Sequence, residues 1–177
     1  LGLFLPKSGD VLVDGVSIHD DIRGWRDQIG YVAQSVFLTD STLRANVAFG
    51  ISDDEVEDDQ IWRVLKEAQL DVFVRSLEDG LDTIVGERGV RMSGGQRQRI
   101  GIARALYRDP EILMFDEATS SLDEQTETAF VDTIRRFKGS KTMLVIAHRM
   151  STIQHCEYVV HLKPDAQYDV QLAKEYF

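Results

Sequence analysis

Residues 111–117, EILMFDE in one-letter code, place a continuous apolar run directly before two adjacent acids, Asp116 and Glu117. The run 112–115 is typical of a parallel strand that is buried on both faces. Ligands of open parallel sheets bind beyond the carboxyl ends of the strands, so the acids are predicted at a ligand-binding edge. The first carboxylate suits Mg²⁺, and the second suits a general base that polarises water. The alternative is a helix start, where acids stabilise the positive end of the dipole.

A second apolar run, residues 143–147, ends at His148. A helix predicted over residues 124–137 separates the two runs, and a βαβ crossover makes its two strands parallel. We therefore expect His148 at the same sheet edge as Glu117, where its ring is able to donate to a terminal phosphate. The remaining histidines and the cysteine show no metal-ligand spacing and are interpreted as structural or exposed: His19, His155, His161 and Cys156.

The segment Ser93-Gly94-Gly95-Gln96 opens a helix predicted over residues 94–107. Ser93 and Gln96 have the spacing of a capping box, which is the purely structural interpretation. Capping does not explain the glycines, each of which costs a helix about 1 kcal/mol relative to alanine. Two glycines in the first turn favour close approach of a phosphate to the backbone N–H groups.

The wider pattern alternates strands with helices, which indicates an α/β fold with a parallel sheet. Apolar periodicity predicts helices between residues 43 and 81, so a mostly helical insertion precedes the core of the second half. Residues 1–5 are predicted to be a helix tail stopped before Pro6. The further expected strands cover residues 10–13, 29–33 and 158–162.

Composition excludes several functional classes. The chain has 177 residues, 43% of them hydrophobic, and a net charge of −10, which argues against a nucleic-acid-binding protein. A single cysteine fits a reducing compartment. No apolar stretch approaches the roughly 18 residues that a membrane span needs. The acidic run at residues 53–59 is interpreted as a solvated loop or a helix start.

Five motifs of the sequence resemble, in order and spacing, those of ATP-binding cassette (ABC) ATPases. Residues 92–96 resemble the signature motif and residues 112–117 the Walker B strand with its catalytic glutamate. Residues 31–34 (YVAQ) resemble the Q-loop, residues 120–123 (SSLD) the D-loop, and His148 the switch histidine. The resemblance covers roughly residues 1–162, and five motifs in register are far more specific than any one of them.

The resemblance implies a partial RecA-like P-loop NTPase core with a parallel sheet and an inserted α-helical signature subdomain. The implied divisions are a remnant of the N-terminal core (1–34), the helical subdomain (35–107), the RecA-like core (108–162) and a tail without an assigned role (163–177). The implied cofactors are ATP and Mg²⁺, in a head-to-tail dimer that sandwiches each nucleotide. The implied catalytic residues are Glu117 and His148, and the implied metal ligands are Asp116 and Gln34. The implied nucleotide contacts are Gln34, Ser93, Gly94, Gly95, Gln96, Ser121 and Asp123.

Residues 83–89 (TIVGERG) resemble the X-loop of exporter-type cassettes, although a polar turn is the structural alternative. Such cassettes usually follow a transmembrane domain and work at the cytoplasmic face of the membrane. By this likeness Gln34, residues 35–50 and Glu87 face the coupling helices of that domain. The resemblance implies no nucleic-acid partner.

The phosphate loop of the family, G-x-x-x-x-G-K-[ST], is absent, since no Gly-Lys pair occurs in the sequence. The sequence is interpreted either as clipped from a longer protein, which a first residue other than methionine favours, or as the product of a decayed gene. We expect this chain alone not to hydrolyse ATP. The main hypothesis is a fragment of the ATP-hydrolysing domain of an ABC exporter or flippase. The alternatives are a soluble ABC-type ATPase of chromosome maintenance or translation, and a non-hydrolysing interaction module.

Overall fold

The computed structural model describes residues 1–87, 89–118, 124–164 and 167–176. Its centre is a parallel sheet with the strand order β3-β6-β7, formed by β3 (Ile29–Val32), β6 (Ile112–Asp116) and β7 (Thr142–Ile146). Both pairings are parallel, and they place Val32 opposite Phe115 and Phe115 opposite Val145. The predicted α/β class and the parallel arrangement of the two apolar runs are confirmed.

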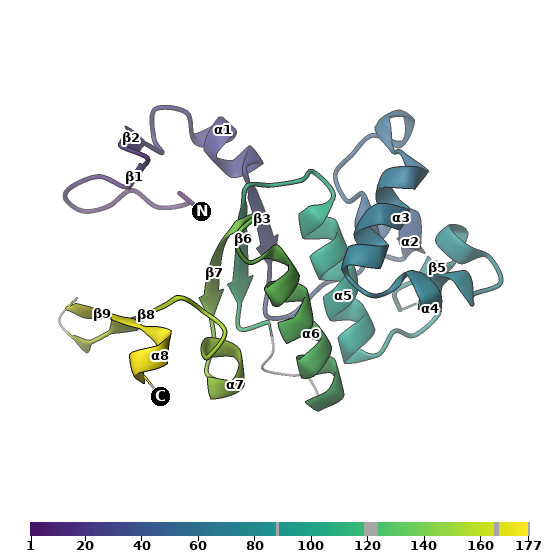
Figure 1. Cartoon of the computed structure of the whole chain (residues 1–177). Helices are drawn as coiled ribbons and strands as arrows, with labels where there is room; N and C mark the ends of the chain where they lie inside the picture. The colour runs from purple at the N-terminus through teal and green to yellow at the C-terminus, as the bar shows by residue number, and fades with distance from the viewer. Residues whose placement is uncertain (88, 119–123, 165–166, 177) are drawn as a thin grey trace.

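Two helices cover one face of this sheet, α5 (Gly94–Leu106) and α6 (Glu124–Phe137) (Figure 1). The side chains that point toward them from β3 and β6 are buried. The ring of Phe115 packs edge to face against that of Phe130 of α6, with the ring centroids 5.2 Å apart. Gly30 allows α5 to approach β3, because a Cβ there would lie 2.6 Å from the carbonyl oxygen of Ala105. The signature helix is thereby fixed directly against the sheet.

The opposite face of the sheet is largely uncovered in the described part of the chain. Tyr31 is 41% exposed, Leu144 52% and Ile146 50%. The sequence predicted strands buried on both faces, as is usual for parallel sheets. Only the face toward α5 and α6 fulfils that expectation, because no helix among the described residues packs on the other one (Figure 1).

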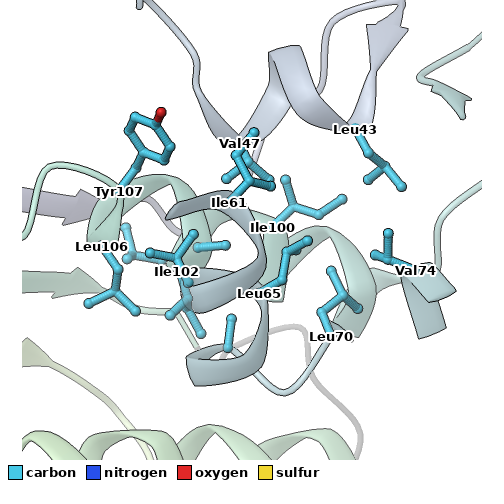
Figure 2. Packing of buried hydrophobic residues seen from close by; sticks show 14 of the residues in the cluster. Leu43, Val47, Ile61, Leu65, Leu70, Val74, Ile100, Ile102, Leu106 and Tyr107 are labelled. Carbon is cyan, nitrogen blue, oxygen red and sulfur yellow. The ribbon is translucent and has the colours of Figure 1, made fainter. Parts of the chain in front are cut away.

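A mostly helical unit joins β3 to α5, as predicted. Its elements are β4 (Ser41–Thr42), α2 (Leu43–Val47), η1 (Asp53–Glu55), α3 (Asp58–Glu67), α4 (Asp71–Arg75), η2 (Gly80–Asp82) and β5 (Ile84–Val85). Its core is shared with α5: Leu43, Ile61, Leu65 and Ile100 are fully buried and lie together (Figure 2). The continuous apolar packing makes the signature helix part of this unit as well as of the sheet layer.

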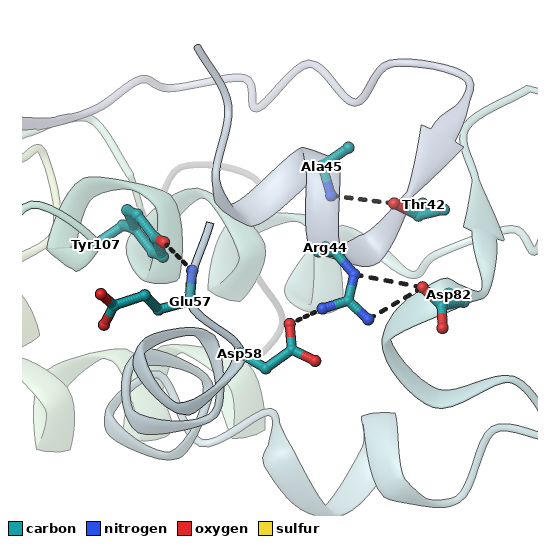
Figure 3. Close-up of polar contacts among 7 residues, drawn as sticks. All are labelled: Thr42, Arg44, Ala45, Glu57, Asp58, Asp82 and Tyr107. Carbon is teal, nitrogen blue, oxygen red and sulfur yellow. Dashed lines mark hydrogen bonds and ion pairs between the residues drawn. The ribbon is translucent and has the colours of Figure 1, made fainter. Parts of the chain in front are cut away.

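Polar contacts hold the unit together at its surface (Figure 3). Arg44 of α2 pairs with Asp58 at the start of α3 and donates to Asp82 of η2. The hydroxyl of Tyr107, just beyond α5, accepts the backbone N–H of Glu57 at 3.1 Å. The acidic run thus forms η1 and the first turn of α3, where acids stabilise the helix dipole.

The helix predicted for the N-terminal segment is not found in the structure. Residues 1–5 form no helix, and Leu3, Phe4 and Leu5 are 66%, 89% and 78% exposed. A segment of five residues without a packing surface cannot offset the cost of helix nucleation. It is followed by the hairpin β1 (Leu12–Val13) and β2 (Val16–Ser17), with Asp14 and Gly15 at positive φ in the predicted turn, and by α1 (Ile22–Asp27).

The prediction for the C-terminal part of the chain was also wrong. Beyond α7 (Met150–Ile153), the predicted core strand 158–162 forms β8 (Tyr158–Leu162), which pairs antiparallel with β9 (Tyr168–Leu172) in a separate hairpin. Its apolar side chains Tyr158, Val160 and Leu162 are exposed, so apolar composition alone did not indicate its partner. The short helix α8 (Ala173–Tyr176) follows this hairpin. In the described residues, no helix has both the length and the apolar character for a bilayer crossing.

Candidate functional site

Glu117 occupies an unusual backbone position at the end of β6. Its φ is +47°, in the left-handed region that residues other than glycine rarely adopt. Its backbone N–H donates to the carbonyl of Ile146, the last residue of β7, at 2.9 Å. A strained position of this kind persists only where the surroundings hold it, and such positions concentrate at functional sites. The turn directs the Glu117 side chain across the carboxyl ends of the strands.

The two oxygens of Glu117 have different partners. The side-chain amide of Gln34 donates to Oε2 at 2.7 Å, and Nε2 of His148 lies 2.8 Å from Oε1. Gln34 follows β3 by two residues and His148 follows β7 by two, so the parallel register brings both to Glu117. The predicted meeting of Glu117 and His148 at one sheet edge is confirmed, and Gln34 joins them there.

Tyr31 is a site residue whose contact the sequence did not predict. Its hydroxyl donates to Oδ2 of Asp116 at 2.9 Å, and this hydrogen bond to a carboxylate raises the pKa of the Tyr31 phenol. In the register of β3 and β6, Tyr31 pairs with Met114, so Tyr31 and Asp116 lie on the same face of the sheet. The contact became visible only once that register was known. We call Tyr31, Gln34, Asp116, Glu117 and His148 the rim cluster.

The donor set of the rim cluster fits Mg²⁺. Asp116 and the side chain of Gln34 offer oxygen ligands, which this hard cation prefers, and it is typically held by one or two such groups together with substrate phosphates. Within the described ranges, no group of three or more histidines, cysteines and acids is placed to hold a metal by itself.

The signature turn, residues 93–96, has the predicted capping box. The Ser93 side chain accepts the backbone N–H of Gln96 at 3.2 Å, and the Gln96 side chain accepts that of Ser93 at 2.8 Å. Gly94 is exposed, and a Cβ at this position would meet nothing within 4 Å, whereas Gly95 is buried. The first turn of this 13-residue helix thus presents open backbone at its positive end.

The signature turn and the rim cluster lie toward the same end of the sheet. The C-terminal part of α5, at Ala105, packs on Gly30 near the start of β3, so α5 runs antiparallel to the strands. Its N-terminus therefore points to the end where the strands carry Asp116 and Glu117 (Figure 1). The predicted contacts Ser121 and Asp123 lie outside the described residues.

Comparison with known proteins agrees with this geometry. A family model described as "ABC transporter" matches residues 1–120. The chain belongs to the ABC transporter family. It is 47% identical over 155 residues to YwjA, an ABC transporter ATP-binding protein of Bacillus subtilis, covering 87% of this chain and 27% of that protein. It is 44% identical over 161 residues to the ATP-dependent lipid A-core flippase of Burkholderia orbicola, covering 90% of this chain and 27% of the flippase.

A solved ABC transporter structure is also similar. It is a bacterial Atm1-family ABC exporter with ATP bound, which matches with a TM-score of 0.86 and 34% identity over 98% of this chain and 30% of the exporter chain. The mixed α/β arrangement with its parallel sheet is therefore that of an ABC exporter's ATP-binding domain. The chain spans about a quarter of the length of the curated relatives named above.

A second surface of this ABC domain lies on the helical unit. Residues 35–50 and Glu87 are expected to face a membrane domain, and the pairing of β4 with β5 joins residues 41–42 to residues 84–85, shortly before Glu87. Asp40 also accepts the backbone N–H of Glu87 at 2.6 Å. Phe37 and Phe49 of this surface are 74% and 55% exposed. Arg104 of α5 donates to the carbonyls of Asn46 and Phe37, so the surface is tied to the signature helix.

Proposed function

We propose that this chain is part of the ATP-hydrolysing domain of an ABC exporter or flippase, which couples binding and hydrolysis of ATP to transmembrane transport. The observation that carries the proposal is the Glu117 carboxylate, held between Gln34 and His148 at the carboxyl edge of the parallel sheet. Glu117 acts as the general base. Positioned in this way, its carboxylate is able to accept a proton from a water molecule that attacks a phosphate.

The neighbouring residues supply the remaining functions of the rim cluster. Asp116 and Gln34 would hold Mg²⁺, and the bound ion would neutralise charge on the phosphates. His148 donates a hydrogen bond to the terminal phosphate, and Gln34 and His148 orient Glu117 until the nucleotide enters. The support is that both contacts to Glu117 come from residues directly beyond neighbouring strands.

The signature turn acts on a nucleotide held mainly by a second domain, in a head-to-tail dimer. Ser93, Gly94, Gly95 and Gln96 contact its phosphates, together with Ser121 and Asp123. The open backbone at Gly94 supports this, because a Cβ at that position would meet nothing within 4 Å. The division of the chain into parts 1–34, 35–107, 108–162 and 163–177 belongs to the same proposal.

In a complete transporter with a phosphate loop, the segment that carries this loop would pack on the uncovered face of the sheet. This face presents Tyr31, Leu144 and Ile146, and a parallel sheet normally has both faces covered by helices. The 177-residue chain contains no Gly-Lys pair, so by itself it hydrolyses no ATP. The surface formed by residues 35–50 and Glu87 faces the transmembrane domain, at the cytoplasmic side of the membrane.

The test is phosphate release by the complete transporter and by this chain alone, each with magnesium and ATP. The complete transporter is expected to turn over ATP, and Glu117→Gln is expected to lower that turnover by about 10²–10⁴-fold. The 177-residue chain is expected to show none. Magnesium-dependent turnover by the chain alone that Glu117→Gln removes would contradict its proposed inactivity. Full turnover by the Glu117→Gln transporter would remove Glu117 from its role.

A further inference from the structure

The side chain of His148 has little packing around it that would hold it in place. The imidazole is 78% exposed, and its contact with Glu117 spans 2.8 Å. A side chain with so little packing reaches one particular oxygen only if the backbone beneath it is fixed. The position of the imidazole at Glu117 therefore depends on the backbone that flanks His148, which includes the residues that follow it.

Those residues are bound to a carboxylate on α6. Arg149 donates to Oε2 of Glu127, and Ser151 donates to Oε1 of the same side chain. The Glu127 side chain is 11% exposed, whereas that of Arg149 is 38% exposed. One nearly buried carboxylate thus accepts a hydrogen bond on each of its oxygens, from the first and the third residue after His148.

This arrangement needs an ionised carboxylate. Arg149 and Ser151 both donate hydrogen bonds, so both side-chain oxygens of residue 127 must act as acceptors. An amide in place of the carboxylate would put an N–H group opposite one of these donors. The hydrogen bonds from Ser151 and Arg149 hold the pKa of Glu127 below its usual value, against the opposite effect of burial. Charge-assisted hydrogen bonds of this kind are roughly twice as strong as neutral ones.

We propose that Glu127 is a positioning residue, whose carboxylate binds Arg149 and Ser151 and so holds the chain where the imidazole of His148 reaches Glu117. The proposal rests on the proposed function, since it serves the part that His148 plays there. Glu127 lies four residues after Asp123 in the sequence, on the helix that follows the predicted D-loop. The Glu127 carboxylate thus connects the helix that follows Asp123, a predicted nucleotide contact, with the loop that carries His148, a predicted catalytic residue.

A first experiment observes the imidazole directly, by NMR of the ring signals of His148 in the 177-residue chain. Glu117→Ala gives the reference signal for a histidine without its partner. In Glu127→Gln the signal is expected to move at least halfway to that reference, and in Ser151→Ala part of the way. Asp132→Asn is the matched control, because Asp132 is an exposed acid of the same helix, and it is expected to leave the signal in place.

Circular dichroism checks that the variants are folded, and Ser151→Ala continues the test if Glu127→Gln is not. A His148 signal that stays at its parental position in folded Glu127→Gln or Ser151→Ala overturns the positioning role. A signal that does not move in Glu117→Ala overturns the contact between His148 and Glu117 itself, and with it the basis of the proposed function.

A second experiment is a double-mutant cycle in the complete transporter, with turnover and the KM for ATP as readouts. Glu127→Gln is expected to lower kcat by between about 10-fold and 100-fold with little change in KM, as for a misplaced catalytic group. Combined with His148→Ala, it is expected to cause no further loss. Multiplying losses in the double variant contradict the positioning role and leave the proposed function intact. Parental turnover in His148→Ala contradicts the proposed role of His148.

Discussion

The backbone N–H of Glu117 donates to the carbonyl oxygen of Ile146 at 2.9 Å. This bond extends the pairing of β6 and β7 one residue beyond Asp116 while Glu117 itself turns into the left-handed region, at a φ of +47°. The chain of β7 continues past Ile146 to His148, so the same two strand ends supply the acid and its histidine. The rim cluster is thus a consequence of parallel strand register, completed by one strained residue.

The first prediction concerns Glu117→Gln in the complete transporter. Glutamine keeps the size of the side chain but cannot accept a proton from water at neutral pH. Turnover is expected to fall by about 10²–10⁴-fold, the usual contribution of a general base. ATP binding is expected to persist, because the remaining residues of the rim cluster are unchanged. Phosphate release and the binding of a fluorescent ATP analogue measure the two effects separately.

Its control is Glu111→Gln, at the opposite end of the same strand. Glu111 is exposed and precedes β6, and its side chain forms no part of the rim cluster. Turnover of this variant is expected to match that of the parent. An equal loss in both variants would show that the charge of the domain, and not the position of Glu117, sets the rate.

The second prediction concerns Tyr31→Phe, which removes the donor to Asp116 and keeps the ring. Partners that orient a metal ligand typically contribute about 10- to 100-fold in metal affinity. The Mg²⁺ concentration for half-maximal turnover is therefore expected to rise by about 10-fold. Turnover at saturating Mg²⁺ is expected to change little. Paramagnetic resonance of bound Mn²⁺ measures the affinity without relying on activity, and an unchanged affinity would separate Tyr31 from the metal site.

The third prediction contrasts two glycines. Gly30→Ala places a Cβ 2.6 Å from the carbonyl of Ala105 and 2.8 Å from Leu113, and overpacking of this kind costs about 1–3 kcal/mol of stability. Gly94→Ala meets nothing within 4 Å and lies in a first helical turn, where alanine favours the helix by up to about 1 kcal/mol. Gly94→Ala is therefore expected to leave the melting temperature unchanged or raised, yet to lower turnover of the complete transporter. Parental turnover would show that no phosphate approaches Gly94.

Much of the site was predictable because chemistry follows the strand ends. The apolar runs before Glu117 and His148 fixed two strands, and one intervening helix made them parallel, so their meeting at one edge followed from topology. The capping box at Ser93 and Gln96 was equally local, since it depends on residues three apart. Such predictions needed no knowledge of which strands pair.

The remaining features depend on pairing partners, which an apolar pattern does not specify. To predict the contact between Tyr31 and Asp116, one needs the register of β3 against β6. To predict the hydrogen bonds to Glu127, one needs the packing of α6 against the chain after His148. The strand 158–162 was expected in the core and lies in a hairpin, because its exposed apolar side chains have no partner in the described chain. Residues 1–5 fail as a helix for the same reason.

The last prediction concerns pH and Glu127. The pKa of this carboxyl lies below its usual 4.5 because Ser151 and Arg149 donate to the ionised form in the folded protein. The unfolded chain therefore binds the proton more readily than the folded one, and the contribution of these hydrogen bonds to stability is complete above about pH 4.5. It is lost as the pH falls through the lowered pKa.

Glu127→Gln is accordingly expected to lower the free energy of unfolding by about 1.5–3 kcal/mol at pH 7, the range for hydrogen bonds to a charged group. Urea denaturation of the 177-residue chain at several pH values measures this difference, which is expected to shrink as the pH falls below about 4.5. Asp132→Asn, on the exposed side of α6, is expected to differ little from the parent at neutral pH. A Glu127→Gln difference that stays constant down to the acid limit of folding would show that its charge is not what stabilises the contact. In that case the neutral shape of the side chain would be sufficient to hold Arg149 and Ser151.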